Sequence, residues 1–408
     1  MKRTTLSATV VAVFLLSVSS QSQSRATSRE DSLATGGAKP ASTFIGGYGS
    51  AVYQNDRNAG ASRATLERVV LFVGHAFTSS ISLFTEMEVE DAKVEGGVEG
   101  GELAFEQAYI KFDVARNHSI VAGLFIPRLG IINEEHLPTS FHGNERPHTE
   151  RLVIPSTWRE LGIGYSGTLD AAGLRYSLAL TTGLDARGFG DGRGIRGGRS
   201  QGSNASADNL ALSGSMQMRA GDFQVQLSGY AGGASGLTAR QADSLQLRSG
   251  MFGTPVLLGE ADVRYEYGGF AARALAAFIT IPDADRINRA YARNTPESLF
   301  GAYAEVAYDL LRVVEDDASA QVFLFLRYEA MDLNATVPSN GIPDDALKQQ
   351  HLVAGVSFLP VPNVVVKADV RSTRTGQANP ALRTDPDAIA VPYQRSNVVA
   401  NLGIGYSF

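Results

Sequence analysis

The chain has 408 residues with 43 Gly, 14 Tyr, 19 Phe and no Cys, and only 19% of its residues are charged. Its formal net charge is -6, and its mean hydropathy of -0.06 is too polar for a helical membrane protein. After residue 20, no apolar run approaches the roughly 18 residues that a spanning helix needs. The composition argues against an ordinary α/β enzyme, and the lack of cysteine excludes a fold held by disulfides.

The amino terminus has the features of a secretory signal peptide. Lys2 and Arg3 precede an apolar stretch from Val10 to Val18, and small polar residues follow. This stretch is too short and wrongly flanked to be a membrane anchor. We expect a cleaved signal peptide over residues 1–24 and a short periplasmic lead over 25–42, so that the mature protein leaves the cytoplasm.

Runs of about ten residues with alternating apolar side chains recur along the rest of the chain. In "SSISLFTEMEVE", Leu83 and Met87 face one side while Glu86 and Glu88 face the other, which is the two-residue period of a β-strand. The runs 65–77 and 270–281 alternate poorly. Sixteen strands are predicted, near residues 43–53, 65–77, 79–91, 102–114, 118–127, 157–169, 172–183, 208–220, 222–231, 256–268, 270–281, 299–311, 319–331, 349–359, 363–373 and 397–408.

The connections between these strands alternate between tight and long. The tight ones, such as "ARNH", "RAGD" and "LPVPN", are rich in turn-forming residues. The long ones begin near residues 54, 92, 128, 184, 232, 282, 332 and 374. Short periplasmic turns and long extracellular loops are typical of outer-membrane barrels. We therefore expect an all-β transmembrane antiparallel barrel over residues 43–408, with about sixteen strands and fourteen to eighteen compatible with the pattern.

A large soluble β-protein, such as a solenoid or a propeller, is the alternative fold. It would also show alternating strands, but no repeat of fixed period supports it. A closed barrel pairs every backbone group internally, as a membrane requires. We therefore favour the barrel.

The third long connection, residues 128–156, is dense in ionizable groups and holds three of the six His. Folded inward, it would narrow the aqueous channel of a wide barrel, and mixed charges at a constriction set ion selectivity. The alternative is a solvated extracellular loop. We favour the constriction because Ile131, Ile132 and the run Leu152–Ile154 need a packing surface. The candidate constriction residues are Arg128, Glu134, Glu135, Arg146, His148, Arg151 and Arg159.

Three other motifs give weaker indications of function than this loop. His136, His142 and His148 recur at six-residue spacing, but this spacing matches no compact zinc motif, so we expect no metal site. Ser140 lies beside a His, yet no base and orienting group can be placed near it, and we expect no catalytic residue. "GRGIRG", residues 192–197, matches a dinucleotide-binding fingerprint, but the sequence after it cannot form the required helix. We therefore expect no cofactor.

The polar faces of the strands carry many charges of both signs. Each Arg or Lys facing lipid at the bilayer midplane would cost roughly 2–4 kcal/mol, so we expect a water-filled lumen. The single Trp158 fits an interfacial aromatic girdle. The lumen-facing candidates are Glu86, Glu88, Lys111, Arg175, Arg264, Glu266, Arg327, Glu329, Lys367 and Arg371.

Two later loops are rich in arginine. They form either a basic vestibule that raises the local concentration of anions or a contact with lipopolysaccharide phosphates. The arginines are Arg187, Arg193, Arg196 and Arg199 in the fourth long loop, and Arg286, Arg289 and Arg293 in the sixth.

From about Ala104 to Gly183 the chain resembles the phosphate-selective porin O and P family. The resemblance is carried by "FEQAYIKFDV", "IVAGLFIPRLGIINEE", "ERPHTERLVIPSTWRELGIGYSG" and "LRYSLALTTGL". It implies a sixteen-strand barrel, usually trimeric, whose third loop narrows the pore. It also marks Arg128, Arg146, Arg151 and Arg159 as candidate pore-loop cations. The chain departs from the phosphate-specific members in having no lysine cluster.

We therefore predict a porin in the outer membrane of a Gram-negative-type bacterium, passing small hydrophilic solutes or ions and preferring anions. Its expected partners are membrane lipids, lipopolysaccharide, the barrel-assembly machinery and two further copies in a homotrimer, with no nucleic acid. The alternative is a barrel enzyme or adhesin without an open pore. In the last run, "VVANLGIGYSF", Leu402, Ile404, Tyr406 and Phe408 should face lipid. The terminal Phe408 also resembles the assembly signal of outer-membrane proteins.

Overall fold

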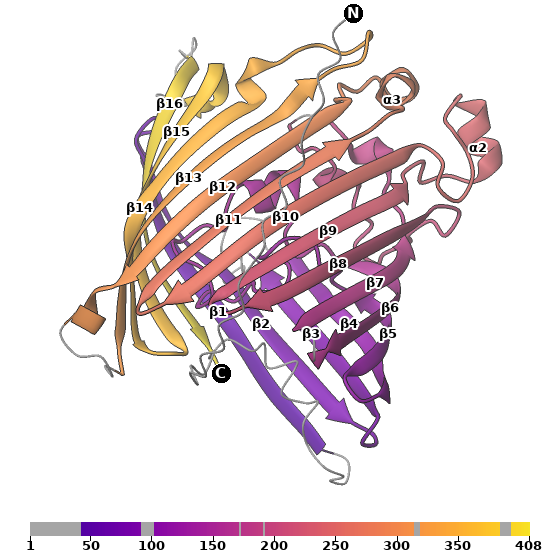
Figure 1. The fold of residues 1–408 in the computed structure, drawn as a ribbon. Coiled ribbons are helices and arrows are strands. Elements are labelled where there is room, and N and C mark those ends of the chain that lie inside the picture. The colour runs from indigo at the N-terminus through magenta and orange to yellow at the C-terminus, as the bar shows by residue number, and fades with distance from the viewer. Residues whose placement is uncertain (1–41, 91–101, 171–172, 191, 314–318, 384–392) are drawn as a thin grey trace, which may run out of the picture. The chain divides into compact units, whose positions relative to one another are not determined.

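The computed structural model describes residues 42–90, 102–170, 173–190, 192–313, 319–383 and 393–408. Within these residues, sixteen strands form one closed antiparallel barrel (Figure 1). Each strand pairs with the strands before and after it in sequence, and β16 closes the barrel against β1. The predicted all-β barrel is therefore confirmed. The predicted signal peptide and nearly all of the predicted lead lie outside the described residues.

Most strand bounds lie within about five residues of the predicted ones, but the strand predicted for 363–373 continues to Arg383, past the point near 374 at which a long loop was expected. The strands are β1 Ser42–Asp56, β2 Ala61–Ala76, β3 Ile81–Glu90, β4 Glu102–Ala115, β5 His118–Phe125, β6 Glu160–Leu169, β7 Leu174–Thr182, β8 Leu210–Ala220, β9 Phe223–Gly233, β10 Pro255–Tyr267, β11 Phe270–Thr280, β12 Ser298–Asp309, β13 Gln321–Thr336, β14 Lys348–Val361, β15 Val364–Arg383 and β16 Tyr393–Ser407. The helical segments are η2 Thr149–Val153, η4 Ala186–Gly188, η5 Arg196–Gly198, α2 Ala239–Ser244, α3 Ala284–Tyr291, η6 Leu310–Val313 and η7 Asp345–Leu347. None of the helices in the described residues is long and apolar enough to cross a membrane.

The long connections lie at one end of the barrel, here called the long-loop end, together with the short β1–β2 turn. The other tight turns lie at the opposite end, the short-turn end. The largest long connections span residues 126–159, 183–209, 234–254 and 281–297. The prediction of a long first loop near residue 54 is wrong. The strands β1 and β2 continue to Asp56 and from Ala61, and they are joined by a tight turn in which Gly60 has a φ of +60°. Glycine adopts this conformation without a steric penalty.

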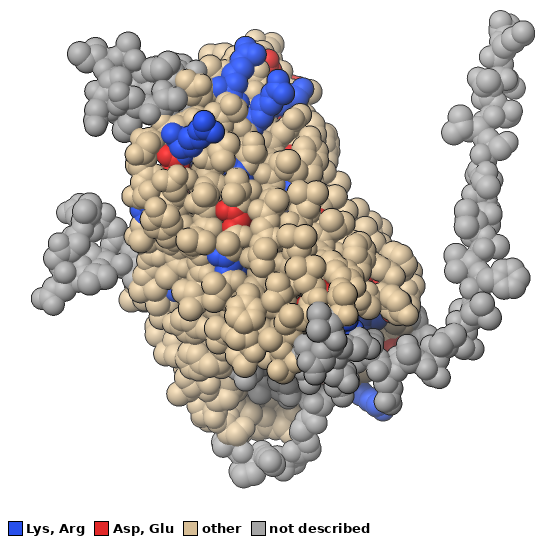
Figure 2. All heavy atoms as spheres, turned by 90° about the vertical axis from the view of Figure 1, so that its left-hand side faces the viewer, with Lys and Arg blue, Asp and Glu red and all other residues tan. Residues whose placement is uncertain are grey.

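The outer face of the barrel is apolar. In β16, Leu402 and Ile404 are 56% and 50% exposed, whereas Asn401, next to Leu402 in the strand, points inward and is buried. Phe408 also lies outward and is 54% exposed. Figure 2 shows one outer face, on which few charged side chains cross the middle and Lys and Arg gather at the upper edge. Such a surface suits a hydrocarbon environment bounded by a polar rim.

A hydrophobic core fills part of the lumen at the long-loop end. It combines side chains from four long connections with inward-facing side chains of β8 to β13. Its members include Leu129, Ile131, Ile154, Trp158, Leu184, Phe189, Ile195, Tyr230, Ile279, Ile281, Ile287, Leu299 and Tyr303. The inner face of β11 is therefore apolar toward the long-loop end, where Leu275, Ala277 and Ile279 are buried, and Arg273 follows on the same face, paired with Glu305. This explains why the run 270–281 alternates poorly: its two faces are both covered by apolar groups.

The interfacial position expected for Trp158 is wrong. Its side chain is fully buried in the internal core and packs on Tyr230, with 4.8 Å between ring centroids. The indole N–H donates to Glu160 at 2.9 Å, which satisfies the one polar atom of the ring. The tryptophan thus holds the end of the 126–159 connection against the inner face of the barrel.

A β-bulge interrupts β4. Glu86 pairs with Gln107 and Met87 pairs with Phe105, so Glu106 is the extra residue between them. Because a bulge re-aims side chains, Glu106 and Gln107 both point into the lumen, where they are buried. Two consecutive inward polar groups are placed in this way opposite β3.

Candidate functional site

The segment between β5 and β6, residues 126–159, lies inside the barrel and is called the inner loop here. Glu150 organises it. The carboxylate accepts hydrogen bonds from the backbone N–H groups of Ile131 and Ile132 at 2.6 and 2.7 Å, and from the Tyr303 hydroxyl of β12 at 2.6 Å. A buried carboxylate is stable when its oxygens are hydrogen-bonded in this way. One side chain therefore joins both arms of the loop to the barrel.

The first arm of the inner loop is held by two strands on one side of the lumen. Glu134 pairs with Arg175 of β7 at 2.7 Å, and Glu135 pairs with Arg264 of β10 at 2.9 Å. Arg128, at the start of the loop, lies 3.7 Å from Glu134. These opposite charges, expected at the constriction and in the lumen, thus form pairs with one another.

The tip of the inner loop is held by β15. The ammonium group of Lys367 donates to the carbonyl oxygens of Phe141 and Gly143 at 2.7 and 2.8 Å. Asp369 accepts hydrogen bonds from the backbone and side-chain amides of Asn144 at 2.7 and 2.6 Å. Charge-assisted bonds of this kind are stronger than neutral ones, so the tip has a defined position.

Strands β13 and β15 also hold the returning arm. Arg327 donates to the carbonyl oxygens of His142 and Glu145 at 3.1 and 3.0 Å, and Arg371 forms an ion pair with the Glu145 carboxylate. Glu329 accepts a hydrogen bond from the backbone N–H of Thr149 at 3.0 Å. The inward charges of these strands thus bind the loop backbone.

These contacts place the inner loop across the lumen. Strands β7 and β15 are eight positions apart around the closed barrel of sixteen strands, and so lie on opposite sides. Glu134 contacts the first of them and Asn144 contacts the second. The loop therefore reaches both sides of the barrel, and a solute in the lumen would have to pass beside it.

The three loop histidines do not come together. His136 faces Glu86 and Glu106, while His142 stacks on Phe325 and His148 stacks on His351 at 4.2 Å between centroids. Burial lowers the pKa of His142 to about 4, and burial together with His351 also lowers that of His148. These two rings are therefore neutral and serve as packing groups.

A group of arginines lies beside the loop at the long-loop end. Its members are Arg146, Arg151, Arg159, Arg196 and Arg199. Arg196 donates to the Arg151 carbonyl oxygen at 3.3 Å, and Arg199 donates to that of Ser156 at 3.2 Å. Within the described residues, neither Arg196 nor Arg199 has an ion pair.

Burial and neighbouring guanidinium groups lower the pKa of Arg196 to about 10 and that of Arg199 to about 9. Both remain protonated at neutral pH. The neighbouring guanidinium groups repel one another, and an anion bound beside them would be attracted by several positive charges.

The remaining candidates are placed as follows. Arg146 donates to the His136 carbonyl oxygen, and Arg159 contacts Glu106 and Gln201. Glu88 pairs with Arg68 on the inner face, and Lys111 pairs with Asp113 near the short-turn end. Glu266 is exposed at that end.

Several arginines of the later loops pair with acids of their own loops: Arg187 with Asp185, Arg286 with Asp283, and Arg289 with Asp285.

Sequence reasoning missed Glu106 and Tyr48. A signal for Glu106 was present, because in "LAFEQAYIKF" the apolar positions change phase between Phe105 and Ala108, as a bulge requires. The contact between Tyr48 and Glu106 joins β1 to β4 across residues far apart in sequence. No sequence signal marks it.

The fold and the inner loop define a porin-type barrel of sixteen strands. Three solved structures share the fold: an anion-selective porin from Comamonas acidovorans, OmpF of Salmonella typhi in complex with daunomycin, and the trimer form of OmpT, an outer membrane protein of Vibrio cholerae. Their TM-scores are 0.54, 0.56 and 0.52 at 11%, 13% and 10% identity. The matches cover 90%, 90% and 91% of this chain and 100%, 97% and 100% of those chains.

No protein-family model matches the chain. A protein of Aquifex aeolicus, described only as uncharacterized, is 31% identical over 338 residues, which are 80% of this chain and 74% of that protein. The chain belongs to the same family as this protein. Membership of the phosphate-selective porin O and P family is not confirmed.

Proposed function

We propose that the protein is an outer-membrane porin that passes small hydrophilic solutes or ions by diffusion and does no chemistry. The observation that carries the proposal is a closed barrel with an apolar outer face and an inner face lined by charges. An enzyme would concentrate its reactive charged groups at one site, whereas here charged groups are distributed along the whole lumen. They do favour hydrated solutes along the entire path.

Water-accessible charges support a path beside the inner loop. The internal core covers β8 to β13 at the long-loop end, and within the described part of the chain it leaves β1 to β5 uncovered. There the side chains of Glu90 and Arg151 are 48% and 45% exposed. At the crossing, Arg128 and Glu135 keep about a quarter and a third of their side-chain surface. We infer a narrow passage between the loop and the barrel.

We further propose a preference for anions. Arg196 and Arg199 supply positive charge at the mouth, and within the described residues neither forms an ion pair with a carboxylate. The nearby acids Glu90 and Glu160 act on them only from a greater distance. The acids of the lumen are in large part paired with bases, as Glu134 is with Arg175, and paired acids repel an anion little. The net field at the mouth therefore favours anions, and phosphate is one candidate solute.

The environment proposed for the barrel follows from its surface. The apolar band requires a membrane, and the polar edge with Lys and Arg in Figure 2 suits lipopolysaccharide phosphates. The trimer form of a structural neighbour supports a homotrimer for this chain as well. Phe408 is proposed as the residue that the assembly machinery reads.

A barrel without an open pore, acting as an enzyme or an adhesin, is the second candidate. It is favoured by the crossing of the inner loop, which contacts both β7 and β15. A liposome-swelling assay with sugars of increasing size separates the two functions. A porin predicts swelling rates that fall with solute size, whereas a closed barrel, inserted at the same density, predicts no swelling with any sugar.

A further inference from the structure

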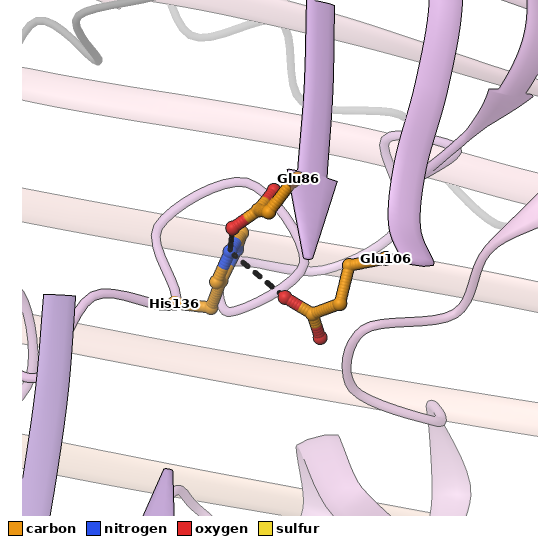
Figure 3. A group of neighbouring side chains, drawn as sticks. All are labelled: Glu86, Glu106 and His136. Carbon is orange, nitrogen blue, oxygen red and sulfur yellow. Dashed lines mark ion pairs between the residues drawn. The ribbon is translucent and has the colours of Figure 1, made fainter. Parts of the chain in front are cut away.

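Three side chains converge where the inner loop meets β3 and β4, on the opposite side of the lumen from the hydrophobic core. Glu86 comes from β3, Glu106 from the bulge of β4 and His136 from the loop (Figure 3). The Nε2 atom of His136 lies 3.6 Å from Glu86 Oε1 and 4.0 Å from Glu106 Oε2. One oxygen or nitrogen of each of the three residues lies within 4.8 Å of the other two.

These distances suit an ion between the groups better than direct hydrogen bonds. An N–H···O bond spans about 2.7–3.2 Å, so the imidazole is too far from both carboxylates to bond well to either. Ligand atoms around a tetrahedral metal, each about 2.1 Å from it, are about 3.4 Å apart. The observed spacings of 3.6 and 4.0 Å exceed this value by about 0.2 and 0.6 Å, and the ligand atoms of the two carboxylates lie within 4.8 Å of each other, so small side-chain movements would close the site around an ion.

Neighbouring groups hold both carboxylates in place. The Tyr48 hydroxyl donates to Glu106 Oε2 at 3.0 Å, and the Gln107 amide donates to Glu86 Oε2 at 2.8 Å. Hydrogen bonds to carboxylate oxygens of this kind fix the direction in which metal ligands point. The other oxygen of Glu106, Oε1, is buried, has no hydrogen-bond partner among the described residues and lies 3.9 Å from the Arg159 guanidinium group.

The site also favours positive charge. Among the described residues, the only ion pair of Glu86 is with His136, and the nearest cation to Glu106 besides this ring is Arg159 at 3.9 Å. Two carboxylates thus face one imidazole nitrogen at 3.6 and 4.0 Å, and a cation placed between the three groups is attracted by both.

We propose that Glu86, Glu106 and His136 bind one divalent transition-metal ion of the zinc type, which ties the inner loop to β3 and β4. Imidazole nitrogen with two carboxylates is a ligand set that Zn²⁺ accepts, with the fourth position left to water. Imidazole selects such an ion over Ca²⁺ and Mg²⁺, which prefer oxygen ligands only. The proposal concerns binding and does not depend on conduction.

The test is a Zn²⁺ titration of the whole protein, folded in detergent micelles and stripped with EDTA. We expect one Zn²⁺ per chain, with affinity at least tenfold weaker in Glu106→Gln and in His136→Gln. His142→Gln, in the same loop but outside the group, should bind as the wild type does. Ca²⁺ or Mg²⁺ at a hundredfold excess should not compete. No binding by the wild type, unchanged binding in both ligand variants, or equal affinity for Ca²⁺ would overturn the proposal.

A spectroscopic measurement covers the case in which the variants fail to fold. Co²⁺ added to the wild-type protein should give the visible absorption of a tetrahedral or five-coordinate ion, and Zn²⁺ should abolish this absorption. A spectrum that remains that of hexaaqua Co²⁺ would contradict the site. Neither the Zn²⁺ titration nor the Co²⁺ spectrum depends on conduction through the pore, so both test the metal site even if the barrel does not conduct.

Discussion

Asp369 of β15 accepts two hydrogen bonds from Asn144, one from its backbone N–H at 2.7 Å and one from its side-chain amide at 2.6 Å. Asn144 lies at the tip of the inner loop and Asp369 on the inner face of the barrel. The two residues are 225 positions apart in sequence. This contact fixes the far end of a loop that begins on the opposite side of the lumen.

We predict that Asp369→Asn loosens the loop tip. The substitution removes the negative charge of the carboxylate to which both amides of Asn144 donate. A hydrogen bond to a charged group contributes about 1.5–3 kcal/mol to stability. Protease cleavage within the inner loop should then speed up roughly ten- to hundredfold, because 1.4 kcal/mol corresponds to a factor of ten in the open population. Asp243→Asn, on the exposed side of α2, is the matched control. Equal cleavage rates in the wild type and Asp369→Asn would contradict this role.

Glu150→Gln should destabilise the barrel more than any exposed substitution of the same type. The amide cannot accept on both oxygens as the carboxylate does, so either the two backbone N–H donors of Ile131 and Ile132 or the Tyr303 hydroxyl lose their acceptor. An unsatisfied buried donor costs about 1–3 kcal/mol. The temperature at which the folded barrel loses its compact migration on a gel should fall, while Glu297→Gln, exposed in the 281–297 connection, should leave it unchanged.

The contribution of His136 to stability should depend on pH. The carboxylates of Glu86 and Glu106 raise its pKa against the effects of burial and of Arg146, so the folded protein holds the proton to higher pH than the unfolded chain. The stabilisation is therefore complete below the unfolded pKa of about 6.5, and it is lost as pH rises through the raised value. With EDTA present, the difference in free energy of unfolding between the wild type and His136→Gln should shrink as pH rises from 6 to 9. A difference independent of pH would show that the imidazole acts only through packing.

Neutralising Arg196 and Arg199 together, as glutamines, should reduce the preference for anions. These guanidinium groups have no acidic partner among the described residues, so their loss changes the potential at the mouth directly. We expect the anion-to-cation permeability ratio, measured from the reversal potential, to fall about two- to tenfold. Arg240→Gln, on the exposed face of α2, should keep the wild-type ratio. If the double substitution leaves the permeability ratio unchanged, Arg196 and Arg199 do not cause the preference for anions.

Deleting Phe408 should lower the yield of assembled barrel and leave the conductance of assembled molecules unchanged. The backbone of Phe408 exchanges two hydrogen bonds with Gly47 of β1, at 3.1 and 2.9 Å, where the first and last strands meet. The ring lies outward and away from the lumen. Phe408→Tyr retains an aromatic end and should assemble normally. A deletion variant that assembles at normal yield would contradict the role in assembly.

The barrel itself could be predicted from the sequence because lipid-facing and inward side chains alternate within each strand, as Leu402 and Asn401 do. The alternation of apolar and polar residues breaks down in strands whose inward side chains are also apolar. Leu275 and Ile279 of β11 pack on loops that return into the lumen, and a local pattern carries no sign of such a return. Trp158 was misplaced for the same reason.

The site was predicted only in part. The charge density of the inner loop and the polar faces of the strands marked Glu134, Arg175 and Lys367 as neighbours of the lumen, but not as partners of one another or of backbone carbonyls. Those pairings depend on which strands lie opposite in the closed barrel, and this is a property of the whole chain. The cluster at Glu106 depends in addition on a bulge, which shifts the register by a single residue.

Single-channel recording in a planar lipid bilayer tests the central claim most directly. A folded, purified barrel should produce stepwise conductance increments in KCl, and a salt gradient should give a reversal potential of the sign expected for anions. The passage beside the inner loop predicts small increments that become larger in Asp369→Asn. A barrel that inserts fully but gives no increments would contradict the proposal of a diffusion channel.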